Sequence, residues 1–234
     1  MASDTKVAMV TGSRQGIGRY VAEQLVAAGC SVVGCSLQPA EWTLANYTHL
    51  QADVSVEQDV KRLFQYVRST FGRLDFTINS AGIASMNHSM LMPASAAGRI
   101  MDTNFLGTFV VCRESAKLMQ RRKAGRIVNL STIAVPMRLE GEAVYAASKS
   151  AVETLTRILA HELGALGITV NAVGPTPVAT NLTRGVPAEA LERIAQRLAI
   201  KRPGTFEDVW NVVEFFLRPQ SSYVTGQVIY LGGA

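Results

Sequence analysis

Short apolar runs alternate with longer amphipathic segments along the 234 residues of the chain. The runs predict strands, and apolar residues recurring three or four positions apart predict helices between them. Strands are expected at residues 6–10, at 31–35, in a run ending at 51–54, and at 74–79, 126–130, 168–173 and 224–231. Helices are expected at residues 17–28, 56–71, 94–120 (as one or two helices), 144–163 and 206–217.

This alternation predicts an α/β fold with a doubly wound, seven-stranded parallel sheet that has helices on both faces. A chain of 234 residues is long enough for one well-buried domain of this class and short for two, so residues 1–234 are expected to form a single domain. Residues 181–205 are polar with scattered apolar positions, and they are expected to cover a substrate cleft.

Composition narrows the class of protein further. No apolar run reaches the ~18 residues of a membrane span, and the first six residues lack the features of a signal peptide, so a cytoplasmic protein without membrane contact is expected. Cys30, Cys35 and Cys112 lack metal-ligand spacing and are expected to be buried thiols. The net charge of +5 is spread along the chain, and residues 121–123 are expected to end a helix before Gly125. Nothing indicates nucleic-acid binding or a metal site.

A glycine-rich turn follows the first predicted strand and opens the first helix. Gly12, Gly16 and Gly18 lie in this turn. Glycines allow the backbone to approach a ligand closely, and the start of a helix offers free N–H groups to a pyrophosphate. The turn therefore predicts dinucleotide binding.

The end of the second strand indicates which dinucleotide is bound. In dinucleotide-binding folds an acidic residue there holds the ribose hydroxyl of NAD and repels the phosphate of NADP. Position 36 is Ser, and Arg14 is available in the glycine turn. NADP is therefore favoured, while NAD remains possible because the short 37–50 connection leaves the closure of that pocket open.

Tyr145 and Lys149 carry the candidate chemistry. In a helix they lie one turn apart on the same face, which places an ammonium beside a phenol. A nearby positive charge lowers the pKa of a phenol, so this spacing predicts that Lys149 lowers the pKa of Tyr145 for general acid-base catalysis. A second signal is Asn104, an unfavourable residue inside a predicted helix.

Six motifs in this order resemble the single-domain members of the short-chain dehydrogenase/reductase family, over essentially the whole chain. They are Thr11-Gly12-x-x-x-Gly16-Ile17-Gly18, Asn79-Ser80-Ala81-Gly82, Asn104, Ser131-Thr132, Tyr145-x-x-x-Lys149 and the loop 175–180. The resemblance implies a Rossmann-type sheet whose ligands bind at the carboxyl ends of the strands.

The resemblance also implies roles for particular residues. Tyr145 is expected to exchange a proton with the substrate oxygen, Lys149 to lower its pKa and bind the nicotinamide ribose, and Asn104 to hold a water that connects Lys149 to solvent. The glycines are expected under the pyrophosphate, Asp53 and Val54 at the adenine, Asn79 and Gly82 along the cleft, and Val178 and Thr180 at the carboxamide. The full set of expected cofactor-binding residues is Gly12, Arg14, Gly16, Ile17, Gly18, Ser36, Asp53, Val54, Asn79, Ala81, Gly82, Tyr145, Lys149, Pro175, Val178 and Thr180.

Two further positions depart from the family pattern. The substrate-orienting serine of the family generally lies thirteen residues before the tyrosine, and here that position is Thr132, with Ser131 as the alternative if the strand end is shifted. Thr176 replaces the glycine that usually follows Pro175, and it would be strained if the position needs a positive φ.

The expected function is NADPH-dependent reduction of a ketone or 3-oxoacyl thioester, since residues 167–171, 225–227 and 232–233 are similar to those of 3-oxoacyl-acyl-carrier-protein reductases. Leu166 lacks the positive charge that grips the carrier in those enzymes, so only Lys123 and its neighbours remain as a docking patch. An NAD-dependent alcohol dehydrogenase and a nucleotide-sensing protein are the alternatives. The resemblance implies a homotetramer or homodimer. The loop 137–142 carries three charges and is expected to be solvated, with contact between Arg138 and a polar substrate as the alternative.

Overall fold

The computed structural model describes residues 5–180 and 186–234. Within them, seven strands form one parallel sheet in the order β3-β2-β1-β4-β5-β6-β7. The strands are β1 (Val7–Thr11), β2 (Ser31–Ser36), β3 (Tyr47–Gln51), β4 (Phe76–Asn79), β5 (Gly125–Leu130), β6 (Ile168–Gly174) and β7 (Val228–Tyr230). The doubly wound α/β fold expected from the sequence is confirmed.

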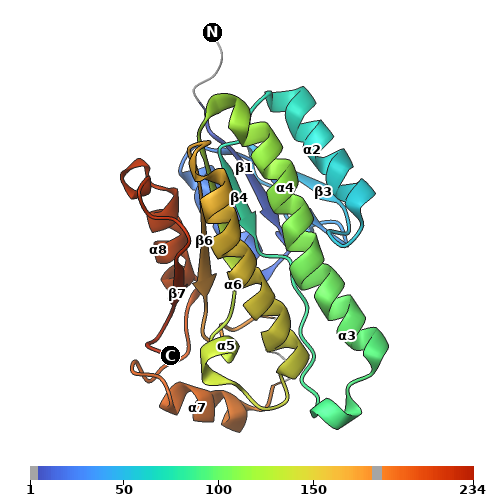
Figure 1. The fold of residues 1–234 in the computed structure, drawn as a ribbon, viewed down its shortest axis with the longest axis vertical. Coiled ribbons are helices and arrows are strands. Elements are labelled where there is room, and N and C mark those ends of the chain that lie inside the picture. Colours follow the sequence, from blue (N-terminus) through green and yellow to red (C-terminus); the bar gives the residue numbers. More distant parts are fainter. Residues whose placement is uncertain (1–4, 181–185) are drawn as a thin grey trace.

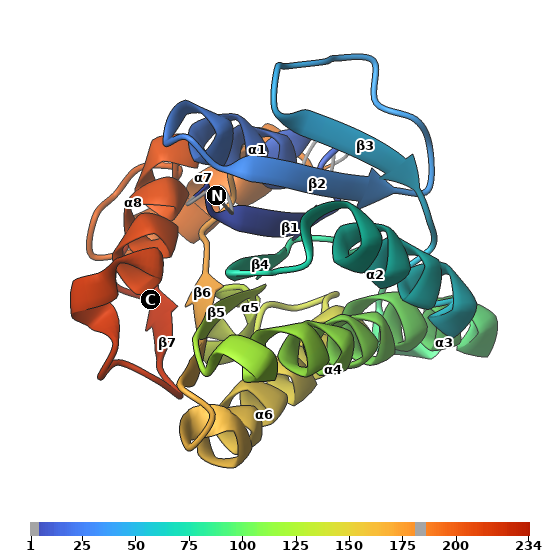
Figure 2. The same ribbon diagram turned by 90° about the horizontal axis from the view of Figure 1, so that it is seen from above.

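Helices cover both faces of the sheet, as Figures 1 and 2 show. One face carries α1 (Gly16–Ala27) and α8 (Phe206–Leu217), and the other carries α2 (Glu57–Phe71), α4 (Gly107–Met119) and α6 (Ala143–Gly164). Each face has its own apolar cluster, because both sides of every central strand are buried. This burial explains why the central strands read as continuous apolar runs in the sequence.

The predicted helix at 94–120 is present in two parts. Helix α3 (Ala94–Met101) joins α4 through a π-helical turn at Asp102–Leu106. The sequence did not predict the short helices α5 (Ala134–Met137) and α7 (Ala188–Gln196), or the single 3-10 turns Ser89–Leu91, Gln120–Arg122 and Pro219–Ser221. Helix α7 lies in the segment that was expected to cover the cleft.

Two strands and one helix end differ from expectation. Strand β3 covers Tyr47–Gln51 and is a partly exposed edge strand, so its apolar signal is weak. Strand β7 begins only at Val228, and the stretch before it is tied to β6 partly through the Asn171 side chain, which bonds the backbone of Val224 and Gln227. The residue that ends the helix before β5 in the left-handed conformation is Lys123, with φ of 49°, and Gly125 begins the strand.

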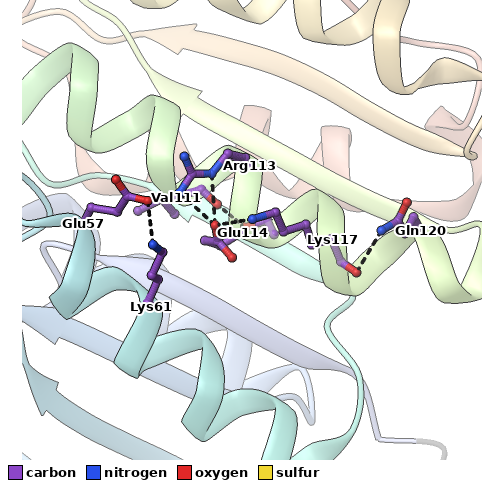
Figure 3. Close-up of polar contacts among 8 residues, drawn as sticks. Glu57, Lys61, Val111, Arg113, Glu114, Lys117 and Gln120 are labelled. Atoms are coloured by element: carbon purple, nitrogen blue, oxygen red, sulfur yellow. Dashed lines mark hydrogen bonds and ion pairs between the residues drawn. The ribbon is translucent and has the colours of Figure 1, made fainter.

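Ion pairs connect α2 to α4 outside the apolar cluster, as Figure 3 shows. Glu57 contacts Lys61 at 2.9 Å and Arg113 at 2.8 Å, and Glu114 contacts Arg113 at 2.9 Å and Lys117 at 2.8 Å. The hydrogen bonds from Lys61 and Arg113 lower the pKa of Glu57 to about 2. Glu57, Lys61 and Lys117 are about half exposed, so their pairs contribute little to stability, whereas Glu114 is buried and two cations compensate its charge.

Several absences hold for residues 5–180 and 186–234. No described helix is long and apolar enough to cross a membrane. Nor does the described part of the chain hold a cluster of three metal-ligating side chains. Cys30, Cys35 and Cys112 are free and buried, which confirms the prediction for these thiols.

Gly18 allows close contact between α1 and the turn that precedes it. A Cβ at this position would lie 2.4 Å from the Gly12 carbonyl oxygen, whereas a Cβ at Gly98, in the middle of α3, meets nothing within 4 Å. We therefore expect Gly18→Ala to lower the free energy of unfolding by about 2 kcal/mol or more through overpacking. In the matched control, Gly98→Ala, the same methyl group is expected to raise it by ~0.5–1 kcal/mol through helix propensity. Urea denaturation measures both changes, and equal effects would contradict the packing argument.

Candidate active site

Two adjoining cavities lie at the carboxyl ends of the strands. The larger, of about 420 Å³, is bordered by the glycine turn and the end of β2, and the smaller, of about 150 Å³, by Thr132, Tyr145 and Lys149. Both cavities are lined by Ile17, Ser80, Gly82 and Thr180. A molecule that extends through both would therefore bring one end next to Tyr145.

The glycine turn forms the floor of the larger cavity. Gly12 has φ of +67°, and a Cβ there would lie 2.8 Å from the Ala81 backbone. The hydroxyl of Thr11 accepts hydrogen bonds from the backbone N–H groups of Ser80 and Ala81, both at 3.1 Å, which ties this turn to the end of β4. The turn leads into the N-terminus of α1, where free N–H groups and the helix dipole favour a phosphate.

The structure brings most of the predicted cofactor residues to the two cavities. The larger is lined by Gly12, Arg14, Gly16, Ile17, Ser36, Asp53, Val54, Ala81, Gly82 and Thr180, and the smaller by Ile17, Gly82, Tyr145, Lys149, Pro175, Val178 and Thr180. Two predicted residues lie outside both. Gly18 instead allows the close contact between α1 and the turn that precedes it. The side chain of Asn79 is buried and donates to Asn129 Oδ1 at 2.8 Å, so the expectation that it lines the cleft is wrong for the side chain.

The connection between β2 and β3 borders the larger cavity with Leu37 and Gln38, and its aromatic residues support the glycine turn from outside the lining. The Trp42 indole N–H donates to the Arg14 carbonyl at 3.0 Å, and its ring stacks on Tyr47 at 4.1 Å. From Tyr47 a chain of hydrogen bonds continues through His49 Nδ1 at 2.7 Å, and from His49 Nε2 to the Ser36 hydroxyl at 3.0 Å. The sequence could have indicated the contact between Tyr47 and His49. They are two positions apart in β3, and residues two apart in a strand share a face.

Tyr145 and Lys149 lie on the buried face of α6, with 8% and 5% of their surface exposed. Lys149 Nζ donates to the Leu130 carbonyl at 2.8 Å, and burial lowers the pKa of Lys149 to about 8. Burial and, to a smaller extent, the carboxylate of Glu142 raise the pKa of Tyr145 to about 12, although the Thr132 hydroxyl acts to lower it. The expected lowering by Lys149 is therefore not found here, since desolvation dominates. Tyr145 is protonated at neutral pH.

The geometry separates Ser131 from Thr132. Ser131 is 4% exposed, and its hydroxyl donates to Glu153 Oε1 at 2.5 Å. The Tyr230 hydroxyl donates to the same oxygen at 2.7 Å. Both residues line the smaller cavity, but the Ser131 hydroxyl is engaged by Glu153, whereas the Thr132 side chain lies beside the Tyr145 phenol and lowers its pKa. Thr132 is the hydroxyl positioned beside Tyr145.

Asn104 lies in the π-helical turn, with no exposed surface. Its side chain bonds the backbone N–H and carbonyl of Ile83, both at 2.9 Å, and the Ser148 hydroxyl at 3.0 Å. A Cβ on Gly82 would meet Asn104 Oδ1 at 3.2 Å and Lys149 Nζ at 3.5 Å, so these three residues are neighbours. Asn104 therefore holds the loop after β4 against α6, and its link to a water stays a prediction.

The loops above the smaller cavity decide two alternatives that the sequence left open. Thr176 does not have a positive φ, so the expected strain is absent at this position, although its buried hydroxyl has no hydrogen-bond partner among the described residues. Arg138 is exposed and lies outside both cavities, so it is not the charged residue of the pocket; Glu142 lines the smaller cavity instead.

The predicted covering segment also contributes to the smaller cavity. Val186, Leu191 and Ile194 line it, the last two from α7. Residues 181–185 of this segment lie outside the described part of the chain.

Comparison with known proteins gives consistent results over nearly the whole chain. A family model described as "Enoyl-(Acyl carrier protein) reductase" matches residues 12–233. The chain is 34% identical over 239 residues to the 3-oxoacyl-[acyl-carrier-protein] reductase FabG of Staphylococcus aureus, covering 98% of this chain and 97% of that protein. It is 30% identical over 239 residues to the protein of the same name from Salmonella typhimurium, covering 100% and 98%.

Solved structures agree with the fold. The aldohexose dehydrogenase of Thermoplasma acidophilum superimposes with a TM-score of 0.90 at 28% identity, covering 98% of this chain and 93% of that one. A putative gluconate dehydrogenase from Agrobacterium tumefaciens superimposes with a TM-score of 0.90 at 27% identity, covering 97% and 94%.

The buried Lys149 ammonium is expected to reduce the stability of the fold. Its folded pKa of about 8 lies below the unfolded value of 10.5, so the unfolded chain binds the proton more tightly. The cost is roughly 3 kcal/mol below about pH 8 and disappears as pH rises from there to about 10.5. Even after the bond to Leu130 is lost, Lys149→Met is expected to raise the free energy of unfolding at pH 7 by about 1–2 kcal/mol.

Thermal and urea denaturation at several pH values measure this effect. Lys201→Met, at an exposed lysine, is the control and is expected to change stability by less than about 0.5 kcal/mol. A Lys149→Met protein less stable than the parent at pH 7 would show that the ammonium stabilises the fold.

Proposed function

Because the chain belongs to the short-chain dehydrogenase/reductase family and is an NAD(P)-dependent oxidoreductase of CH–OH or C=O groups, we propose that it reduces ketones or 3-oxoacyl thioesters with NADPH. The observation that carries this proposal is the placement of Tyr145, Lys149 and Thr132 together in the smaller cavity, which adjoins the larger one. The names of the relatives, which are reductases of acyl-carrier thioesters and sugar dehydrogenases, support this range of substrates.

The larger cavity fits a dinucleotide. Gly12 and Gly16, both with positive φ, line it together with Ile17 at the start of α1. Gly12, Gly16 and Ile17 would hold the pyrophosphate, Asp53 and Val54 the adenine, and Val178 and Thr180 the carboxamide. When bound, NADPH supplies the hydride. Ser36 and Arg14 favour NADPH, since neither carries a negative charge that would repel the additional phosphate. Arg14 pairs only weakly with the exposed carboxylate of Glu41, at 3.4 Å, so its guanidinium can also bind a phosphate.

In the proposed reaction the protein positions the carbonyl and provides the proton. The Thr132 hydroxyl donates a hydrogen bond to the substrate oxygen, and Tyr145 donates its phenolic proton as that oxygen gains negative charge. A pKa near 12 suits reduction of the carbonyl, in which Tyr145 acts as the acid, because it keeps Tyr145 protonated through neutral pH. Lys149, held by Leu130, would bind the ribose and stabilise the phenolate that results.

Assembly and location are also proposals. We propose a homotetramer or homodimer built on α4 and α6, supported by Leu106, Phe109 and Ile158, which stay 46%, 36% and 50% exposed on these helices or the turn before α4. We propose a cytoplasmic location, supported by three free buried thiols. We propose no nucleic-acid or membrane partner.

Removing the phenolic hydroxyl tests the mechanism. Tyr145→Phe is expected to lower kcat for carbonyl reduction by about 10²–10⁴-fold, since general acid catalysis contributes that much. NADPH binding, measured by fluorescence titration, is expected to change little. Tyr223→Phe, at a fully exposed tyrosine, is the control. Undiminished turnover in Tyr145→Phe would refute the mechanism, and tight NADPH binding without turnover of any carbonyl or alcohol by the parent would favour a nucleotide sensor.

Replacing Ser36 tests the cofactor preference. The parent is expected to bind NADPH about tenfold or more tightly than NADH, because Arg14 can pair with the additional phosphate. Ser36→Asp is expected to make NADH the more tightly bound cofactor, because the new carboxylate repels the additional phosphate. Arg14→Ala is expected to reduce the preference for NADPH. The dissociation constants of both cofactors for each variant measure the effect. Tighter binding of NADH by the parent would indicate an NAD-dependent alcohol dehydrogenase instead.

A further inference from the structure

The smaller cavity combines an apolar wall with one carboxylate. Met86, Leu139 and Leu191 are typical of its lining, and Glu142 is the single acidic residue among the described residues that line it. An acyl chain or an unsubstituted ketone would be satisfied by the apolar wall alone. The carboxylate therefore requires its own explanation.

Glu142 has no structural use that accounts for its carboxylate. It occupies the N-cap position of α6, yet its side chain makes no capping hydrogen bond. Within residues 5–180 and 186–234, no hydrogen bond or ion pair is found for the carboxylate. The one buried cation in this cavity, Lys149, is held by Leu130, and Arg138 of the same loop is exposed. A partly buried carboxylate without a partner is unfavourable, and desolvation raises the pKa of Glu142 accordingly.

The carboxylate lies close to the reacting group. It raises the pKa of Tyr145 through its charge, and the two residues are three positions apart at the start of α6. A substrate whose carbonyl oxygen contacts Tyr145 and Thr132 would thus present the atoms next to its carbonyl carbon to Glu142. An ionised carboxylate can only accept hydrogen bonds, so it selects a donor at that place.

We propose that Glu142 sets the substrate class by accepting a hydrogen bond from a hydroxyl group next to the reacting carbonyl, so that hydroxyketones are preferred over unsubstituted ketones and 3-oxoacyl thioesters. This inference rests on the proposed carbonyl reductase function and narrows it. A hydroxyl is a better partner than an ammonium group, because Lys149 already places a positive charge in the same cavity. A substrate without a hydrogen-bond donor next to its carbonyl leaves the Glu142 carboxylate unpaired. A pocket built to bond a substrate hydroxyl rejects analogues that lack it most strongly, because its buried polar group is then left without a partner.

Matched ketones test the proposal. Phenacyl alcohol and propiophenone differ only by a hydroxyl in place of a methyl, as do hydroxyacetone and butanone. For at least one pair, the parent enzyme is expected to show a kcat/KM that is higher by about tenfold or more for the hydroxylated ketone. A hydrogen bond to a charged group contributes enough free energy for a ratio of that size. Glu142→Leu is expected to abolish that preference, mainly by slowing the hydroxylated ketone. Glu140→Leu, in the exposed part of the same loop, is the control and is expected to retain it.

The outcomes separate the two proposals. If the parent reduces both members of each pair equally, or if the preference survives in Glu142→Leu, the inference is overturned while carbonyl reduction stands. Faster reduction of aminoacetone than of hydroxyacetone would also overturn it, because the partner would then be a cation. If neither pair is reduced with NADPH or NADH, the proposed function itself fails. Should Glu142→Leu not fold, as judged by its thermal transition, Glu142→Gln is expected to weaken the same preference.

Discussion

The hydrogen bond from the buried Lys149 ammonium to the Leu130 carbonyl fixes the active-site helix against the end of a central strand. Leu130 is the last residue of β5, and Ser131 and Thr132 follow it directly. The bond therefore sets the distance between the helix that carries Tyr145 and the loop that carries Thr132. It also places a desolvated charge inside the protein, which the packing of the sheet and its helices has to outweigh.

A second connection reinforces the first. Glu153 lies two turns beyond Tyr145 on α6, is 4% exposed, and accepts hydrogen bonds from Ser131 and Tyr230. It thereby joins α6 to the ends of both β5 and β7. A buried carboxylate that receives two hydrogen bonds is compensated, whereas Glu142, nearer the cavity, is not. The two glutamates illustrate how one helix uses the same residue type to hold a loop and to face a cavity.

The order of the motifs made the site predictable in outline. Parallel strands end at one edge of the sheet, so residues after β1, β4, β5 and β6 had to meet there, and they do. The side-chain directions were less predictable. Asn79 points into the core, and Arg138 points to solvent while Glu142 lines the cavity. Such choices depend on the local backbone and on which neighbour offers a hydrogen bond, neither of which a motif specifies.

The sequence by itself determined the alternation of strands and helices, the conformation of the glycine turn, and the shared face of Tyr145 and Lys149, because these follow from local periodicity and backbone sterics. Only the tertiary structure decided that Thr132 and not Ser131 stands beside Tyr145, that Trp42 supports the glycine turn at Arg14, and that Tyr145 has a raised pKa. Spacing along a helix predicts which side chains are neighbours. The pKa of a buried phenol depends instead on how much water the whole fold excludes, and here desolvation is the largest cause of the raised pKa.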